Sequence, residues 1–176
     1  PEELVEQAKA LGLAAIGIAD RNSVAGVVRA HVKADTEGFR IVPGARLVFA
    51  DGTPDILAYP SDRAAWGRLT QLLSKGKLKA EKGDCILHLS DLIERIEGLH
   101  LIVMPPSRVD SVKLSKLLGQ LKQHVSKRSL WLAANFLYAG DDRRRVAKLA
   151  RIATGTFIPL IATNDVLYHH PWRRML

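Results

Sequence analysis

The segment Ile158-Pro159-Leu160-Ile161-Ala162-Thr163-Asn164-Asp165-Val166-Leu167-Tyr168-His169-His170 decides how the chain folds near its end. It begins with a short apolar run, which predicts a buried strand. The run then breaks into a polar turn that carries Asn164, Asp165 and two histidines. In α/β proteins, the loops that follow the carboxyl ends of strands converge on the functional site. The segment therefore predicts a site around Asp165.

Strand-like and helix-like segments alternate through most of the chain. Apolar runs predict strands over 13–19, 39–49, 56–59, 99–104, 129–133 and 158–162, and helical spacing predicts helices over 1–11, 24–36, 62–74, 110–126 and 141–153. The turn at 51–54 predicts an antiparallel pairing of the strands on either side, and the first of these strands is expected to be interrupted at Pro43-Gly44. The basic segment 75–83 contains two glycines and is predicted to be a loop. The alternation as a whole predicts an α/β domain with a parallel sheet, either open or closed into a barrel.

The composition is that of one soluble, basic domain. The chain has 176 residues and a net charge of +8, which favours polyanionic surroundings such as nucleic acid. No apolar run approaches the roughly 18 residues that cross a bilayer, so no membrane partner is expected. The single cysteine, Cys85, excludes an internal disulfide and favours a reducing, cytoplasmic compartment. The sequence begins at Pro1 and has neither an initiator Met nor the pattern of a signal peptide. The chain is therefore interpreted as part of a longer polypeptide.

Two basic segments are weak candidates for contact with nucleic acid or a partner protein. Arg143, Arg144 and Arg145 follow two aspartates near the start of a predicted helix. They could grip a phosphate backbone or an acidic surface, or form an exposed helix face with local Asp–Arg pairs. The second candidate consists of the lysines of the predicted loop, namely Lys75, Lys77, Lys79 and Lys82.

Two aspartates are placed to form a site at the edge of the sheet. Asp20 and Asp165 each follow an apolar strand, so in parallel strands they would share one rim, where a metal or phosphate could bind. The alternative is that each carboxylate caps a helix or shapes a turn. His169 follows Asp165 closely enough to be a second ligand, although adjacent histidines before Pro171 are also compatible with a solvated tail.

Four segments, in this order, resemble the polymerase and histidinol phosphatase (PHP) family. They are residues 1–13, Ala19-Asp20-Arg21 with Gly26, residues 41–46, and residues 162–168. The chain looks most similar to the amino-terminal PHP domain of bacterial C-family DNA polymerases, in the error-prone branch that acts in translesion synthesis. The resemblance implies one domain over 1–176, with polymerase domains downstream. It also implies a distorted (β/α)7 barrel that is incomplete here, because the first barrel strand and its His-x-His motif would precede Pro1.

Active PHP proteins hold two or three metal ions at the carboxyl rim of the barrel, but several ligand positions of this sequence depart from the family's pattern. The family's Asp-His is Asp20-Arg21, its glutamate after Pro-Gly-x is Arg46, and the histidine of its Asn-Asp-Val-His is Leu167. No histidine stands just before residue 56 or in 130–137. Arginine stays protonated and has no free electron pair for a metal. We therefore interpret Asp20, Arg21, Arg46, Asp165, Leu167 and His169 as positions of a degenerate metal site.

The expected function is that of a non-catalytic structural domain in an error-prone DNA polymerase of damage-induced mutagenesis. No catalytic residue and no cofactor are expected in this chain, and zinc or manganese only if the degenerate site still binds it. We expect the two rim arginines to pair instead with Asp20 and Asp165. The expected partners are DNA, through the full-length polymerase, and other replication or mutagenesis subunits. The alternatives are an active metal-dependent phosphoesterase or 3′–5′ exonuclease, and a basic nucleic-acid-binding module.

Overall fold

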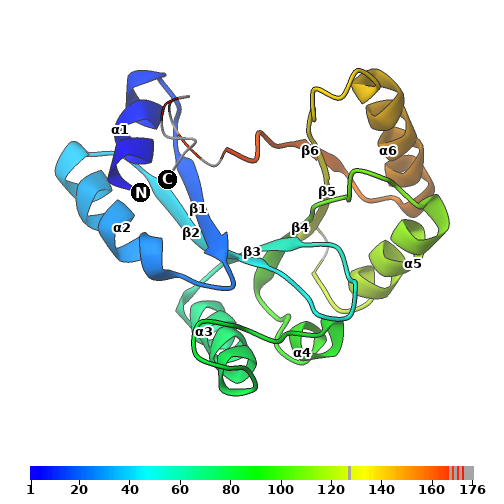
Figure 1. Cartoon of the computed structure of the whole chain (residues 1–176), viewed down its shortest axis with the longest axis horizontal. Coiled ribbons are helices and arrows are strands. Elements are labelled where there is room, and N and C mark those ends of the chain that lie inside the picture. The colour runs from blue at the N-terminus through cyan, green and yellow to red at the C-terminus, as the bar shows by residue number, and fades with distance from the viewer. Residues whose placement is uncertain (127, 167, 169, 171, 173–176) are drawn as a thin grey trace.

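Six strands form one sheet whose spatial order is the order of the sequence. The computed structural model describes residues 1–126, 128–166, 168, 170 and 172. The strands are β1 (Ile16–Arg21), β2 (Ile41–Leu47), β3 (Ile56–Pro60), β4 (Leu99–Val103), β5 (Leu130–Ala134) and β6 (Leu160–Ala162). The sheet curls into a half-barrel that is open between β1 and β6 (Figure 1). The α/β class predicted from the sequence is confirmed.

The sheet is mixed rather than wholly parallel. Strand β3 is antiparallel to both β2 and β4, whereas the other three pairs of neighbours are parallel. The antiparallel pairing across the turn at 51–54 is therefore confirmed. Because β3 runs against its neighbours, its amino end lies at the same rim as the carboxyl ends of the other strands. This reversal brings the residue before β3 into the candidate site.

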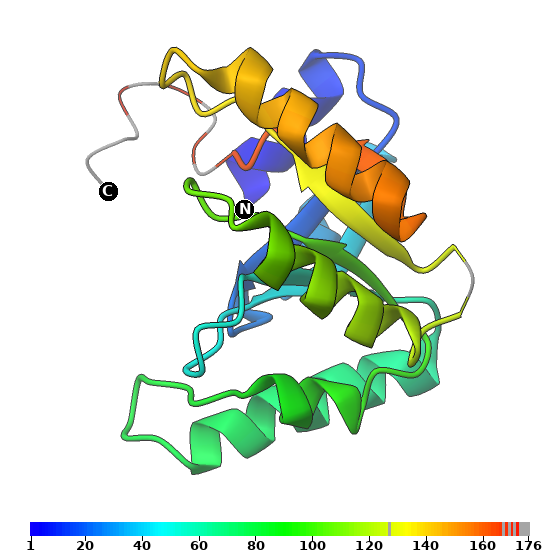
Figure 2. The same cartoon turned by 90° about the vertical axis from the view of Figure 1, so that its right-hand side faces the viewer.

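The six helices of the described residues all pack outside the curl. They are α1 (Glu2–Ala10), α2 (Ala25–Glu37), α3 (Arg63–Leu78), α4 (Leu89–Ile93), α5 (Ser111–Lys122) and α6 (Asp142–Thr156). Helices α1 and α2 cover β1 and β2, and α5 and α6 lie side by side over β4 to β6 (Figures 1 and 2). The main core lies between the convex face of the sheet and α3 to α6, and contains the fully buried Leu47, Ile56, Leu72, Leu101 and Leu132.

The prediction of a loop over 75–83 is wrong for its first part, because α3 continues to Leu78. Gly76 lies so close to the following segment that a Cβ there would be 2.6 Å from Cys85 Sγ and from Leu87 Cδ2. The absence of a side chain thus lets the returning chain pack on the helix. Burial against the helix also raises the pKa of the Cys85 thiol.

The predicted interruption of the second strand at Pro43 is also wrong, since β2 runs unbroken from Ile41 to Leu47. The pairing with β3 begins only at Ala45, so at Pro43 the strand is paired with β1 alone. The next residue, Gly44, makes room for Tyr59 on the concave face. A Cβ at Gly44 would lie 2.5 Å from the Tyr59 ring and 2.6 Å from the carbonyl oxygen of Ala58.

Candidate functional site at the rim of the sheet

Charged residues from four parts of the chain meet at the carboxyl rim of the half-barrel. Arg21 ends β1, and Arg46 lies directly beside it in the register of β2. Asp55 precedes β3, and Asp165 follows β6. The alternation of side chains along a strand places Arg21 and Arg46 on the concave side, because their neighbours Asp20 and Leu47 pack toward the helices.

Arg46 is the centre of this cluster. Its Nε donates to Asp55 Oδ2 at 2.7 Å, and its Nη1 donates to Asp165 Oδ1 at 2.8 Å. Arg21 Nη1 lies 3.7 Å from the same Asp55 oxygen. The Arg46 side chain is only 18% exposed, whereas that of Arg21 is 66% exposed. The guanidinium of Arg46 therefore bridges two carboxylates, and Arg21 adds a weak, solvated ion pair.

The charges of the cluster favour the protonated guanidinium. Burial by itself would lower the pKa of Arg46, but the hydrogen bond to Asp55 and the charges of Asp165 and Asp55 outweigh burial and leave this pKa above its usual value. Arg46 thus supplies a permanent positive charge between the two aspartates.

Asp20 does not take part in this cluster, so the expected pairing of Asp20 with a rim arginine is wrong. Its side chain points to the helix layer, where Oδ2 accepts a hydrogen bond from the Gly26 backbone N–H at 2.7 Å. Gly26 is in the first turn of α2, and a Cβ there would also lie 2.7 Å from the Asp20 carboxylate. The capping alternative considered for Asp20 therefore describes its geometry.

Sequence reasoning missed two residues that shape the rim. Asp55 occupies the position just before β3, where the sequence signal was an acidic residue directly ahead of an apolar strand. Asn22 follows β1 with a left-handed φ of 45°. Its side chain exchanges two hydrogen bonds with the backbone of Val48, at 2.8 and 3.0 Å, and so holds the ends of β1 and β2 together.

The remaining candidate positions of the rim are Leu167 and His169, and both lie outside the described residues. Among the residues that the structure does describe, no three His, Cys, Asp or Glu side chains are grouped so that they could hold a metal ion. The donor chemistry gives the reason, because Arg46 stands between the two rim carboxylates and has no lone pair for a metal. The described residues of the rim do not fit a metal cluster.

The basic candidates from the sequence have very different environments. Lys75 and Lys79 are bound to the buried carboxylate of Asp91, with Nζ–Oδ1 distances of 2.8 and 3.1 Å, so both are engaged within the protein. Lys77 and Lys82 are exposed, and no ion pair of theirs is found in the described part of the chain.

The three consecutive arginines divide in the same way. Arg143 and Arg144 are exposed, but Arg145 is only 6% exposed. Its Nη1 donates to the carbonyl oxygen of Asn135 at 2.9 Å and its Nη2 to that of Pro105 at 3.1 Å. Arg145 therefore ties α6 to the loops that follow β4 and β5. Arg145 thus differs in its environment from Arg143 and Arg144, and contact of these three residues with nucleic acid or a partner protein stays a prediction.

Comparisons with known proteins connect this geometry to two groups. No protein-family model matches the chain. It is 58% identical over 176 residues to Error-prone DNA polymerase 1 of Rhizobium meliloti (strain 1021), and 54% identical over 185 residues to the error-prone DNA polymerase of Bradyrhizobium sp. (strain ORS 278). Homologues named error-prone DNA polymerase thus cover the whole chain. The chain spans 16% of the length of each of these two relatives.

The fold is similar to those of two proteins of known structure. A protein named as a metal-dependent phosphoesterase, from Bifidobacterium adolescentis, matches with a TM-score of 0.67 and 14% identity, over 97% of this chain and 82% of its own. An amidohydrolase from Chromobacterium violaceum, solved with bound sulfate and no metal, matches with a TM-score of 0.63 and 16% identity, over 98% and 83% of the two chains. At these identities the likeness concerns the fold. Within the described residues, no helix is both long and apolar enough to span a bilayer.

Proposed function

We propose that this chain is the amino-terminal PHP domain of an error-prone DNA polymerase that acts in damage-induced mutagenesis and translesion synthesis in the cytoplasm. The support is the 54% and 58% identity to parts of two such polymerases, together with the curled α/β fold. The domain occupies residues 1–176, and the polymerase domains, with the nucleotidyl-transfer chemistry, are placed downstream. DNA is then a partner through the full-length polymerase, as are other replication or mutagenesis subunits.

We further propose that the domain is structural and does not hydrolyse phosphoesters. The observation that carries this proposal is the position of Arg46, which donates to Asp55 and Asp165 where a metal-binding rim would need electron-pair donors. A fixed guanidinium there repels divalent cations and neutralises the carboxylates that would attract them. The ion pairs also join β2, the start of β3 and the segment after β6, so they replace a metal cluster as the element that holds the rim together.

The alternative, an active metal-dependent phosphoesterase or exonuclease, is favoured by the fold similarity alone. Metal content separates the two hypotheses. For the structural domain, elemental analysis of the purified chain should give well under one equivalent of zinc, manganese or iron, and EDTA should leave the Tm unchanged.

Activity provides a second test. The chain should not hydrolyse p-nitrophenyl phosphate or a single-stranded oligonucleotide when manganese is added. Stoichiometric metal together with hydrolysis that EDTA abolishes would overturn the structural assignment and establish the phosphoesterase.

A further inference from the structure

The positive charge of the chain is concentrated in its second part. Residues 1–97 contain 13 basic and 14 acidic residues, whereas residues 98–176 contain 13 basic and only 4 acidic ones. Ten of these 13 basic residues are among the residues that the structure describes, and they lie in or between the elements β4, α5, β5, α6 and β6.

The ion pairs show the same asymmetry. In the first part, cations are neutralised locally, for example Lys33 by Glu6 and Glu37, and Lys75 by Asp91 and Glu94. Among the described residues, each lysine or arginine that forms an ion pair lies at or before Arg95. The basic residues of α5 and α6 are left without a carboxylate partner within this part of the chain.

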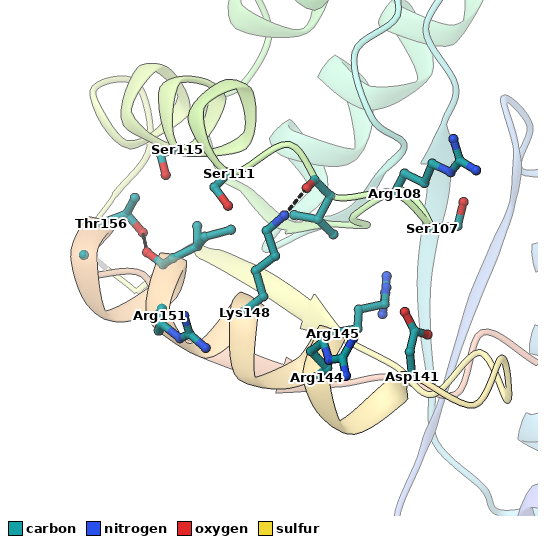
Figure 3. A pocket seen from close by; sticks show the side chains of 13 residues that line it. Ser107, Arg108, Ser111, Ser115, Asp141, Arg144, Arg145, Lys148, Arg151 and Thr156 are labelled. Carbon is teal, nitrogen blue, oxygen red and sulfur yellow. Dashed lines mark hydrogen bonds between the residues drawn. The ribbon is translucent and has the colours of Figure 1, made fainter.

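Five cations that form no ion pair line one groove between α5 and α6, four of them on α6 and Arg108 in the loop before α5 (Figure 3). The groove has a volume of about 860 Å³, and among the described residues Asp141 is the single carboxylate on its wall. The cations are accompanied by hydroxyl groups, which can donate hydrogen bonds to an anion. The polar lining consists of Arg108, Arg144, Arg145, Lys148, Arg151, Ser107, Ser111, Ser115, Thr156 and Asp141.

The spacing of the cations forms a stripe along the groove. Arg144, Lys148 and Arg151 are four and three residues apart, so they lie on one face of α6 and follow its axis. Like charges at this spacing destabilise a helix unless an anion lies between them. In the same wall, the Nε of the buried Arg145 has no hydrogen-bond partner in the described structure. Lys148 also donates from Nζ to the carbonyl oxygen of Val109 in the loop before α5 (Figure 3), which leaves Arg144 and Arg151 as the exposed cations of the stripe. The stripe is thus suited to a ligand with repeated negative charge.

Exposed aromatic side chains stand at both ends of α6. Phe136 and Tyr138 precede the helix and are 57% and 92% exposed, and Phe157 follows it and is 84% exposed. Tyr138 has a left-handed φ of 55°, a backbone conformation that residues other than glycine rarely adopt. Phe136 and Tyr138 lie in the loop that leads into Asp141 at the groove wall, although neither ring lines the groove itself. Aromatic rings near a row of cations are the combination by which proteins hold single-stranded nucleic acids, because unpaired bases stack on the rings while the phosphates follow the charges.

We propose that the α5–α6 groove binds the phosphodiester backbone of a single strand of nucleic acid, with bases stacking on Phe136 and Tyr138. Packed helices lie about 8–10 Å apart, so a groove between them admits one backbone rather than a duplex. An acidic peptide would pair its carboxylates with the cations, but it has no bases that could stack on the aromatic rings. The groove is formed by α5 and α6 and shares no residue with the Arg46 cluster, so this inference goes beyond the proposed function.

The test measures binding of a fluorescently labelled dT20 oligonucleotide to the 176-residue chain by anisotropy, at several salt concentrations. The groove variant is R144E/R151E, and the matched control is K77E/K82E, which makes the same change in net charge at four positions that are all exposed. We expect the groove variant to weaken binding about tenfold or more and to reduce the salt slope by about 1.4, because two phosphate contacts are lost. The control should change affinity less than about threefold, because its lysines contact no phosphate. Circular dichroism verifies that both variants are folded.

A second variant separates nucleic acid from an acidic protein segment. F136A/Y138A should weaken dT20 binding, since each stacked base contributes about 1–3 kcal/mol, or roughly fivefold or more in affinity, by alanine substitution. Polyglutamate of matched charge should compete poorly with dT20. Equal losses in the groove and control variants, or equal competition by polyglutamate, would overturn the proposal. The metal content and the hydrolysis assay test the rim and not the groove. The proposal that the rim is structural can therefore fail or hold independently of the proposal for the groove.

Discussion

The guanidinium of Arg46 and the carboxylate of Asp165 lie 2.8 Å apart, although 119 residues separate them in the chain. Arg46 belongs to β2, and Asp165 belongs to the segment after β6, which crosses the open side of the half-barrel (Figure 1). The contact therefore joins the two ends of the curled sheet at the rim where the concave surface opens. Because the contact is an ion pair between a guanidinium and a carboxylate, it occupies the carboxylate that a metal would need. This is the basis for regarding the rim as structural.

Removing the bridging guanidinium should destabilise the domain. Arg46→Ala leaves Asp55 and Asp165 close together without their shared donor, so we expect a loss of about 1–3 kcal/mol in the free energy of unfolding. Arg21→Ala is the matched control and should cost less than about 0.5 kcal/mol, because its ion pair is exposed and long. Urea titration of the three proteins measures both values. Equal effects of the two variants would contradict the central role of Arg46.

Replacing the rim cations by donors should create metal binding. In R21H/R46E, a glutamate joins Asp55 and Asp165 and an imidazole stands beside them, which is a donor set suited to zinc or manganese. We expect addition of either metal to raise the Tm of this variant by several degrees, because a metal that binds the native state and not the unfolded state stabilises the native state. R46Q, which removes the charge without adding a carboxylate, is the control and should not respond. A comparable metal-induced rise in the unmodified chain would refute the idea that Arg46 blocks the site.

The buried carboxylate of Asp91 should make stability depend on pH. Burial alone would raise its pKa, but hydrogen bonds from Lys75, the His88 N–H and Lys79 outweigh burial and hold the pKa far below its usual value. The stabilisation is therefore complete above the ordinary aspartate pKa of about 3.9 and is lost as the pH falls below it. We expect Asp91→Asn to cost about 1–3 kcal/mol at pH 7 and progressively less below about pH 4. Urea titrations of both proteins from pH 3 to 7 check this, and a difference that does not depend on pH would contradict it.

The close contact between Gly17 and Tyr59 should be detectable by double substitution. A Cβ at Gly17 would lie 2.7 Å from the Tyr59 hydroxyl oxygen and 3.2 Å from Cζ. Gly17→Ala should therefore cost about 1–3 kcal/mol by overpacking, and Tyr59→Phe in the same chain should recover most of the loss, because it removes the nearest atom. Gly67→Ala is the control within α3, where nothing lies within 4 Å of the added Cβ, and it should stabilise by about 0.5–1 kcal/mol. Absence of recovery in the double variant would show that the hydroxyl is not the obstacle.

Alanine substitution should destabilise the domain much more at Arg145 than at Arg143, although the two residues are only two positions apart. Arg145→Ala leaves the buried carbonyl oxygens of Asn135 and Pro105 without donors and opens a cavity, so we expect a loss of about 2–4 kcal/mol. Arg143→Ala, at an exposed position, should change stability by less than about 0.5 kcal/mol. Thermal unfolding followed by circular dichroism distinguishes the two. Similar Tm values would show that the carbonyl contacts contribute little.

Most helices and strands were predictable because their signals are local. Asp62 and Asp110 are caps whose side chains accept from the first turns of α3 and α5, and the apolar spacing of each helix marks its buried face. The errors arose where tertiary packing decided the outcome. The chain around Gly76 has loop-like composition, yet Lys75 and Lys79 are held by Asp91, fifteen residues from the glycine, and the helix continues to Leu78.

The sequence alone determined the alternation of strands and helices, the antiparallel turn, the replacement of expected ligands by Arg21 and Arg46, and a positive net charge, because each of these is a property of residue type and spacing. Only the tertiary structure decided the partners. The direction of β3 brought Asp55 to Arg46, and the alternation of side chains along β1 turned Asp20 toward α2. The packing of α5 against α6 gathered cations from separate segments into one groove. The physical reason is that these contacts depend on which side of a strand or helix faces a distant part of the chain. Sequence spacing shows which residues share a side, but the neighbouring elements decide what that side contacts.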